Sequence, residues 1–404
     1  MHMFKVMINR ILAGRHYWRV VSFDEIAELY TSRLLTIFAV NIVNLFAAVY
    51  LYKLGYAVEF IVLFYGVLYL LKVPFSIVAA KYAAYFGPKH GILLANIVRI
   101  PSMVAFLLVP EFGFWAIVAF GIFQQIAATI YDLCYMVDFS KVKNSEHAGK
   151  EIGTMQIFDK IARIVSPIVG GVIASVYGPQ VTIIVASLML VVAAVPLFKT
   201  IEPTMTRNKL RIAGFPWRLA RSSLVAESVI GFDFVASGMT WTLFMTLFVF
   251  EKYGDATYAA LGGLASLGVF IGMIAAWTFG QIVDRHKGGV LLVIGAAANT
   301  VIHLFRPFVA SAPGVMGINA ANEIATSAYV MPFTRVIFDV ADSSGYRITY
   351  MMFIEMVLNF GAALGCFTLY ICMVVLGLRE GMMAMFVVAA FYGLLLLLIR
   401  RAAK

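Results

Sequence analysis

The chain has 404 residues, of which 62% are hydrophobic and only 13% are charged. Soluble globular proteins carry a charge on about a quarter of their residues, so this composition excludes a soluble enzyme or a soluble binding module. The apolar residues are spread over the whole length of the chain, which indicates a polytopic membrane protein.

The formal net charge of +10 would suggest a nucleic-acid partner in a soluble chain. Here most of the 31 Lys and Arg residues fall in the termini and in the even-numbered loops between predicted spans. By the positive-inside rule this asymmetry places both termini in the cytoplasm and the chain in the cytoplasmic (inner) membrane of the cell. We therefore expect no nucleic-acid partner. The N-terminal region also lacks the apolar core of a cleavable signal peptide.

Residues 1–31 form the first predicted unit, an amphipathic N-terminal segment on the cytoplasmic side. Basic residues such as Arg10 lie among apolar ones such as Trp18. This composition fits a helix lying on the inner leaflet, and it fits an unstructured basic tail equally well. Ser22 and Glu25 form a capping box, which predicts the start of a helix that continues into the first span.

Twelve apolar stretches follow, each long enough to cross a bilayer as a helix. The predicted spans are residues 32–53, 57–84, 91–109, 114–138, 152–177, 180–198, 223–250, 257–280, 290–310, 314–338, 347–376 and 381–399. The longest connection, residues 199–222, is basic and is predicted to be a cytoplasmic linker between two units, residues 32–198 and 223–404. The expected fold class is an all-α integral membrane protein.

An internal repeat relates these two units. At one constant offset, residues 86–94 align with 284–292, and residues 126–131 align with 324–329. Residues 53–55 align with 252–254 at nearly the same offset. Chance similarity among apolar segments does not keep its offset over separated places, so we expect two homologous halves related by an axis along the membrane normal.

The short loop at residues 280–289 joins two spans and therefore forces an antiparallel helical hairpin. Its Gly280, Asp284 and Arg285 match the loop signature G-x-x-x-D-R-x-G-[RK]-[RK], while Lys287 stands where the signature has Gly. The loop resembles that of the major facilitator superfamily. The resemblance implies twelve transmembrane helices in two pseudo-symmetric six-helix bundles, and it implies that these four residues gate the outward-facing state.

Charged side chains inside membrane spans are costly, so each one is a candidate for function. Glu227 and Arg306 lie near the ends of their spans and are expected to reach the membrane surface. Arg99, His303 and Arg306 lie on spans 3 and 9, which pack outside the central cavity in the superfamily. We therefore expect structural roles for these three.

Span 5 carries three charges on one side. Its polar residues at helical spacing are Gln156, Asp159, Lys160 and Arg163. Such a stripe faces protein or water rather than lipid. Asp159 and Arg163 lie one turn apart and can neutralise each other. Alternatively, Arg163 holds an anionic group or the Asp132 carboxylate on span 4.

Three acids lie inside spans of the second half, namely Asp233, Glu323 and Glu355, with no obvious base nearby in that half. A carboxyl group buried without a cation favours its protonated form and can exchange protons near neutral pH. We expect at least one of these acids to couple proton movement to transport. The predicted proton-coupling residues are Asp159, Asp233, Glu323 and Glu355.

Polar residues on spans 1, 4, 5, 7, 10 and 11 complete the predicted site, because these spans line the central cavity in the superfamily. On span 10, Asn319, Asn322 and Glu323 belong to a polar stripe that lipid would not accept. For Asn41 and Asn44, hydrogen bonding between helices is the alternative role. The predicted substrate-binding residues are Asn41, Asn44, Gln125, Asp132, Gln156, Arg163, Asn322 and Asn359.

The direction of transport is predicted from residues 166–171 on span 5, which resemble the G-P-x-x-G-G core of the superfamily's antiporter motif with Ser166 in place of the first Gly. The prediction is a secondary transporter that works by alternating access and couples protons to export of an amphiphilic or drug-like compound. The alternatives are proton-coupled uptake of a polar or anionic nutrient, favoured by Lys72, Lys160 and Arg163, and lipid flipping.

Other function classes lack their sequence signals. The chain has no ATP-binding P-loop, and its six His residues are too scattered for a catalytic or metal cluster. Cys134, Cys366 and Cys372 all lie in predicted spans, where we interpret them as small apolar fillers. We expect no enzymatic activity, no cofactor and no metal. The expected partners of the monomer are a small-molecule substrate, the proton and the lipid bilayer.

Overall fold

The computed structural model describes residues 23–142, 148–177, 179–194, 209–250, 256–284 and 288–396. Within these ranges the chain is helical and contains no β-strand. The predictions for residues 1–22, for Arg285 and for Lys287 lie outside the described residues.

The described residues of the first half form six long helices and one short helix. They are α2 (Phe23–Lys53), α3 (Val58–Phe86), α4 (Pro88–Leu107), α5 (Val109–Phe112), α6 (Phe114–Val142), α7 (Ala148–Tyr177) and α8 (Pro179–Ala194). The described part of α2 extends from Phe23 through Lys53, so residues 23–31 are helical and continuous with the first span.

The described residues of the second half form six more helical rods. The first is continuous and joins α9 (Trp217–Phe234), the π-helix η2 (Val235–Thr240), α10 (Trp241–Phe244) and the π-helix η3 (Met245–Val249). The others are α11 (Ala256–Asp284), α12 (Gly288–Phe305) with the 3₁₀ turn η5 (Arg306–Phe308), α13 (Ala312–Ser344), α14 (Arg347–Leu376) and α15 (Leu378–Gly393). The described part of each of the twelve predicted spans therefore falls on one long helical rod.

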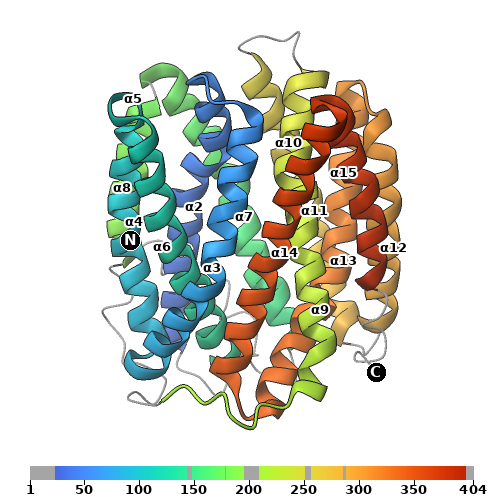
Figure 1. Ribbon diagram of the computed structural model, residues 1–404. Helices are drawn as coiled ribbons and strands as arrows, with labels where there is room; N and C mark the ends of the chain where they lie inside the picture. The colour runs from blue at the N-terminus through green and yellow to red at the C-terminus, as the bar shows by residue number, and fades with distance from the viewer. Residues whose placement is uncertain are drawn as a thin grey trace.

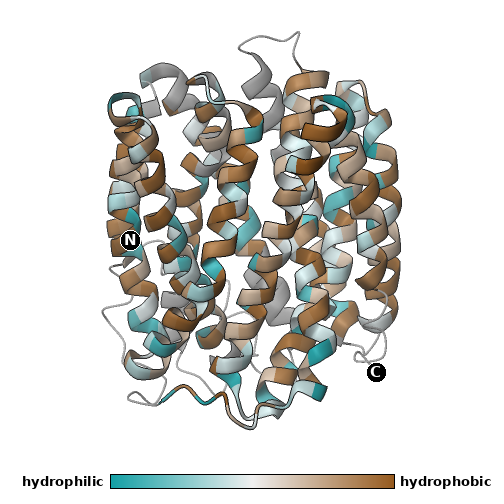
Figure 2. Cartoon of the chain, in the orientation of Figure 1, coloured by the Kyte–Doolittle hydropathy of each residue, from teal (hydrophilic) through white to brown (hydrophobic). Residues whose placement is uncertain are grey.

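The outer surface of the bundle is apolar. Eight of the described helices are long and apolar enough to cross a membrane, and the apolar stretches Tyr30–Val43 and Gln180–Ala194 are shorter. Large side chains such as Trp115 (76% exposed) and Val375 (72% exposed) point away from the protein. Hydrophobic residues dominate the helices in Figure 2. Lipid is the solvent that such a surface requires, so this is a multi-pass membrane protein.

The turn between α3 and α4 shows how sequence sets a helical hairpin. Gly87 adopts φ +94°, where a side chain would be strained, and its N–H donates to the Ala83 carbonyl at 3.0 Å to end α3. Pro88 follows in the first turn of α4, where no backbone N–H is needed. This turn corresponds in the repeat to the loop at residues 280–289.

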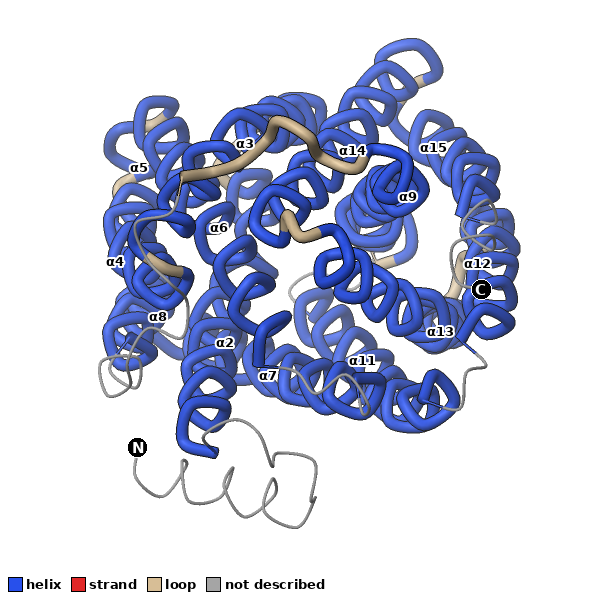
Figure 3. The backbone as a smooth tube through the Cα atoms, turned by 90° about the horizontal axis from the view of Figure 1, so that it is seen from below, coloured by secondary structure: helices blue, strands red, loops and turns tan. Residues whose placement is uncertain are grey.

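The two halves stand side by side as two groups of helices (Figure 1). Seen along the helix axes, α3 lies beside α14 and α7 lies beside α11, and these pairs make the main contacts between the halves (Figure 3). In the internal repeat α3 corresponds to α11, and α7 corresponds to α14. The two contacts are therefore related by the pseudo-twofold axis that the repeat predicted.

The halves also meet where α6 and α13 end, which we call the linker end because residues 209–216 run along it. Phe139 on α6 and Phe338 on α13 contact each other, with their ring centroids 5.4 Å apart. Both belong to one buried cluster that draws residues such as Tyr135 and Phe333 from the two halves. Aromatic packing thus closes the interface between the halves at the linker end.

The linker is anchored to the first turn of α14. The hydroxyl of Tyr346 donates to the carbonyl of Ala213 at 3.0 Å, and the hydroxyl of Thr349 donates to the carbonyl of Arg211 at 2.5 Å. Phe215 is buried between the rings of Trp217 and Tyr346. These contacts fix the described part of the linker against the second half.

Candidate functional site

The first candidate cluster lies between the halves, on α3, α6 and α14. Lys72 Nζ on α3 lies 3.2 Å from Glu355 Oε1 on α14 and 3.9 Å from Asp132 Oδ2 on α6. Asn359, one turn along α14, donates from Nδ2 to the same Glu355 oxygen at 2.7 Å. The Lys72 and Glu355 side chains are only 8% and 9% exposed, whereas Asp132 is 44% exposed. A buried lysine therefore joins the two halves through a carboxylate.

The second cluster also joins the halves. Lys160 on α7 donates from Nζ to Glu323 Oε2 on α13 at 2.5 Å. Gly272 on α11 lies against this pair, and a Cβ there would come within 2.5 Å of the Glu323 oxygen and 2.7 Å of Lys160 Nζ. The glycine therefore provides the space in which the ion pair forms.

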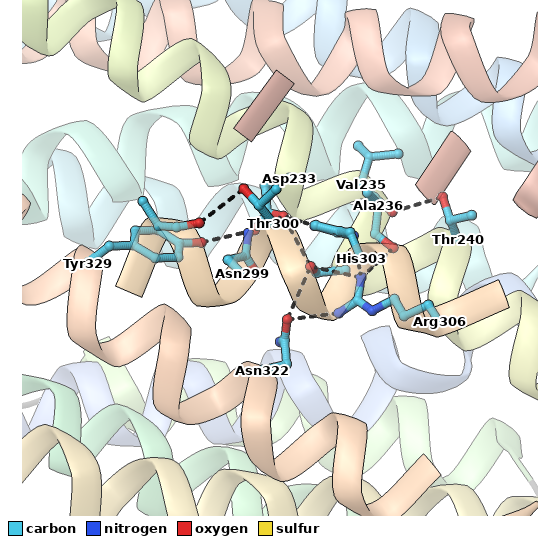
Figure 4. A network of polar contacts seen from close by, with 12 residues as sticks. Asp233, Val235, Ala236, Thr240, Asn299, Thr300, His303, Arg306, Asn322 and Tyr329 are labelled. Carbon is cyan, nitrogen blue, oxygen red and sulfur yellow. Dashed lines mark hydrogen bonds and ion pairs between the residues drawn. The ribbon is translucent and has the colours of Figure 1, made fainter. Parts of the chain in front are cut away.

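The third cluster is a polar network inside the second half, built around Asp233 at the end of α9 (Figure 4). Its Oδ1 accepts from Asn299 Nδ2 at 3.0 Å and lies 2.5 Å from His303 Nε2, both on α12. Its Oδ2 accepts from the Tyr329 hydroxyl on α13 at 2.9 Å, and Ser237 lies one turn further along the rod with its hydroxyl 3.2 Å from Oδ1. Four side chains thus satisfy one buried carboxylate.

The protonation of His303 follows from its neighbours. Its Nδ1 lies 3.2 Å from Arg306 Nη1. Arginine can only donate, so Nδ1 accepts, and the ring proton sits on Nε2 and is donated to Asp233. This arrangement describes a neutral imidazole that links a cation to a carboxylate.

Arg306 is fully buried in the same network. Its Nη1 donates to the Ala236 carbonyl at 3.3 Å and to Ser237 Oγ at 3.0 Å, and its Nη2 donates to Asn322 Oδ1 at 2.8 Å. Its guanidinium lies 5.3 Å from the ring centroid of Trp241. The expectation that Arg306 reaches the membrane surface is therefore wrong, because these acceptors hold it inside the protein. Glu227, expected to do the same, is also buried.

The π-helical turns of the first rod help to shape this network. In η2 the hydroxyl of Thr240 donates to the carbonyl of Val235, five residues earlier, at 3.1 Å. A π-turn widens the helix and leaves carbonyl groups less tightly paired, and such turns occur often at functional sites. Here the carbonyl of Ala236 accepts from Arg306.

The fourth cluster lies in the first half. Arg33 on α2 donates two hydrogen bonds to the carboxylate of Asp159 on α7, from Nε to Oδ1 at 3.0 Å and from Nη2 to Oδ2 at 2.9 Å. The Arg33 guanidinium also lies 4.2 Å from the ring centroid of Tyr135, and Arg99 lies 4.8 Å from that of Tyr131. Tyr131 and Tyr329 occupy equivalent positions in the repeat, and each contacts the charged cluster of its own half.

The predicted substrate residues separate into two groups in the structure. Asp132, Asn322 and Asn359 take part in the clusters above, whereas Asn41 donates to the Ile37 carbonyl of its own helix at 2.8 Å. Gln125 is buried on α6, and Arg163 is exposed on α7.

Several predictions cannot be compared with side-chain positions. Asn44 lies in α2 and Gln156 in α7, but their side chains are outside the described part of the chain, as is that of Asp284. Gly280 lies buried within α11, so of the four predicted gating residues only its position is described in full.

Two expectations about charge pairing are wrong. Asp159 pairs with Arg33 rather than with Arg163, and Asp132 lies by Lys72 rather than by Arg163. The three acids of the second half were expected to have no base nearby in that half; this is wrong for Asp233, whereas Glu323 and Glu355 pair with bases from the first half. The pairs are Asp233 with His303, Glu323 with Lys160, and Glu355 with Lys72.

The sequence reasoning also missed Arg33, Trp241 and Tyr329. Arg33 lies just inside the first predicted span, where a charge is itself a signal. Tyr329 falls in the segment that repeats residues 126–131. Trp241 carried no recognisable signal, because aromatic residues are frequent along the whole chain. Among the described residues, no three His, Cys, Asp or Glu side chains come together as a metal site would need.

Comparison with known proteins agrees with this architecture. The family model described as Major Facilitator Superfamily matches residues 29–365. No curated protein sequence matches the chain.

Solved transporter structures share the fold at low sequence identity. A structure of the E. coli fucose:proton symporter FucP has a TM-score of 0.66 at 12% identity, covering 94% of this chain and 98% of that one. The human organic anion transporter MFSD10 gives 0.69 at 10% identity, with 91% and 98% covered. A bacterial homologue of the iron transporter ferroportin, in an outward-facing state, gives 0.70 at 13% identity, with 93% and 98% covered. The chain belongs to the major facilitator superfamily, and it is a secondary transporter rather than an enzyme.

Proposed function

We propose that this transporter couples the movement of protons to the uptake of a small polar or anionic solute. The observation that carries the proposal is the cluster of Lys72, Glu355 and Asp132, in which a buried cation joins the two halves through a carboxylate. Any movement of the halves against each other changes the partners of Lys72. The protonation state of Glu355 and the position of the halves are therefore linked.

The charge of the substrate decides how protons and substrate are coupled. Protonation of Glu355 removes its negative charge and leaves Lys72 free to bind another anion. A proton and an anionic substrate then favour the same state, which is symport. A cationic substrate would compete with the proton for Glu355, which is antiport. Lys160 repeats the arrangement opposite Glu323, so two lysines at the interface between the halves favour an anion.

The similar transporters are compatible with this proposal. FucP moves fucose together with protons, and MFSD10 is a transporter of organic anions. Their sequence identities of 12% and 10% show a shared fold and no more, so they support the proposal only by example.

Proteoliposomes with an internal pH indicator test the coupling. Addition of small carboxylates, gluconate among them, is expected to acidify vesicles that hold the wild-type protein. Glu355→Gln is expected to keep carboxylate counterflow but to lose proton movement, while the exposed Glu380→Gln serves as a matched control. Proton movement that persists in the Glu355→Gln variant would refute the proposed coupling.

Export of an amphiphilic compound is the second candidate. It is favoured by the antiporter-like segment at residues 166–171, where Gly170 lets α7 approach α2 so closely that a Cβ would lie 2.9 Å from the Ile42 carbonyl oxygen. Close helix packing through small residues also serves other purposes, so this observation carries less weight. An outward flux of lipophilic cations, driven by an inward proton gradient in vesicles of known orientation, would favour export over uptake.

A further inference from the structure

Two asparagine side chains on α13 have their amide orientation fixed by chemistry. Asn322 Oδ1 accepts from Arg306 Nη2 at 2.8 Å, and Asn319 Oδ1 accepts from the indole Nε1 of Trp241 at 2.7 Å. Arginine and tryptophan nitrogens can only donate. Each amide must therefore turn its oxygen toward its buried partner and its NH₂ group the other way.

Both NH₂ groups remain available. Neither Nδ2 donates to a described residue, and neither belongs to the described side-chain atoms that are both unpaired and sealed from solvent. Asn319 and Asn322 are half-buried, and they lie three residues apart on one face of the helix, roughly 5–6 Å from Cβ to Cβ. Together they present as many as four N–H donors to one place.

The hydrogen bonds behind these amides all run in the same direction. Arg306 donates to Asn322, so the Asn322 NH₂ continues a chain of donors that starts at a buried cation. Hydrogen bonds that run head to tail strengthen one another, and the next group along the chain must be an acceptor. Lys160, paired to the adjacent Glu323, adds a second cation nearby.

The position of these amides suits a transported solute. They lie seven and ten residues into α13, roughly 10 and 15 Å from its start, which puts them in the first third of this 33-residue helix, toward the end of the bundle opposite the linker end. Glu323, the residue after Asn322, contacts the first half through Lys160. The two amides therefore lie beside the interface along which the halves move.

We propose that Asn319 and Asn322 form a donor pair that binds one oxygen-rich group of the substrate, such as a carboxylate or a sulfonate, and that disfavours an ammonium group there. Trp241 and Arg306 are positioning residues, since they hold the amides without contacting the substrate. The inference rests on the proposed uptake of a polar or anionic solute and names the subsite for its polar group.

Matched ionic probes test this subsite by thermal shift of the purified, full-length protein. Gluconate is compared with N-methylglucammonium, and benzenesulfonate with benzyltrimethylammonium, because the members of each pair share a polyol chain or a phenyl ring and carry opposite charges. In the wild type the anion of at least one pair is expected to stabilise the protein through binding. Stabilisation by neither anion, or equal stabilisation by both members of each pair, would overturn the proposal.

Substitutions at the two asparagines and at Trp241 test whether the anion binds at this subsite. Asn319→Asp and Asn322→Asp keep an oxygen for Trp241 and Arg306 but replace the donors with an acceptor, so anion affinity is expected to fall about tenfold or more. Trp241→Phe keeps an aromatic ring but removes the indole N–H that fixes the orientation of the Asn319 amide. We expect it to weaken anion binding several-fold. Trp217→Phe, at the linker end, is the matched control. Unchanged anion affinity in both Asp variants would refute the subsite.

These outcomes are separate from those of the coupling experiment. If the subsite is correct and the coupling is wrong, the Asp variants lose anion binding while Glu355→Gln leaves proton movement intact. If the coupling is correct and the subsite is wrong, Glu355→Gln abolishes proton movement while the Asp variants bind anions like the wild type.

Discussion

Lys72 is shielded from solvent and lies next to carboxylates from two other helices. Taking a lysine and a glutamate out of water costs several kcal/mol for each ion, and the pair recovers this cost only through close contact and additional hydrogen bonds. Asn359 supplies one of those hydrogen bonds to Glu355. Loss of either charge therefore leaves the other charge buried without a partner, which is energetically costly.

A double-mutant cycle measures this dependence. Lys72→Met leaves Glu355 buried without its cation and is expected to lower the free energy of unfolding by about 3 kcal/mol. The double variant Lys72→Met/Glu355→Met should recover most of that loss, since no buried charge remains. Chaotrope-induced unfolding in detergent gives the values. Additive effects of the two single variants would mean that the side chains do not interact.

Gly272 supports a prediction about the second pair. A Cβ at this position would lie 2.5 Å from Glu323 Oε2 and 2.7 Å from Lys160 Nζ, so Gly272→Ala is expected to push the ion pair apart and to reduce transport several-fold. Gly263→Ala on the same helix meets nothing within 4 Å and serves as the control. Transport assays in vesicles compare the two variants. Equal activities would show that the Lys160–Glu323 pair has no part in transport.

The sequence identified most of the charged residues of the site, but it did not identify their partners. Lys72, Lys160, Glu323 and Glu355 are all conspicuous as charges within apolar spans. Their pairing depends on which helices of the two halves lie together, and no local pattern in the sequence encodes that. The Asp233 network was missed for a similar reason, because His303 and Arg306 lie on a helix that was expected to be peripheral.

At the scale of the elements, the backbones of α9 and α14 lie in close contact. A Cβ on Gly231 would lie 1.9 Å from the Leu358 carbonyl oxygen, and a Cβ on Gly361 would lie 1.9 Å from the Ser228 carbonyl oxygen. Only glycine permits two helix backbones to approach in this way.

Gly361→Ala therefore forces α9 and α14 apart. We expect it to lower the free energy of unfolding by about 3 kcal/mol, although alanine is the better helix former. Gly238→Ala, on the same rod as Gly231, meets no atom within 4 Å and is the matched control. Thermal unfolding of the two purified variants compares their stabilities. A Gly361→Ala protein as stable as the control would contradict the close packing.

The elements were easier to predict than the site. Long apolar stretches can cross a membrane only as helices, and breakers such as Gly87 and Pro88 mark where one helix ends and the next begins. The π-helical turns of residues 235–240 and 245–249 had no such signal, since they differ from an α-helix only in which carbonyl each N–H reaches. Tertiary contacts such as that of Arg306 with the Ala236 carbonyl accompany the wider turn.

At the scale of the whole molecule, the pseudo-twofold axis organises the contacts between the halves. The α3–α14 and α7–α11 contacts are symmetry-related, and they leave the remaining interface free to open at one end or the other. In this structure aromatic side chains, including Phe139 and Phe338, close it at the linker end. We propose that this end faces the cytoplasm and that transport requires these contacts to separate.

Electron-spin distance measurements at the two ends of the bundle test that account most directly. One pair of labels, at Lys81→Cys and Asp342→Cys, spans the halves near the linker end, and another, at Glu111→Cys and Glu380→Cys, spans them at the opposite end; all four positions are exposed. Cys372, the free cysteine that is not fully buried, is replaced by alanine. When the pH is lowered to protonate Glu355, we expect one distance to lengthen while the other shortens. Distances that stay fixed, or that change in the same sense, would contradict alternating access.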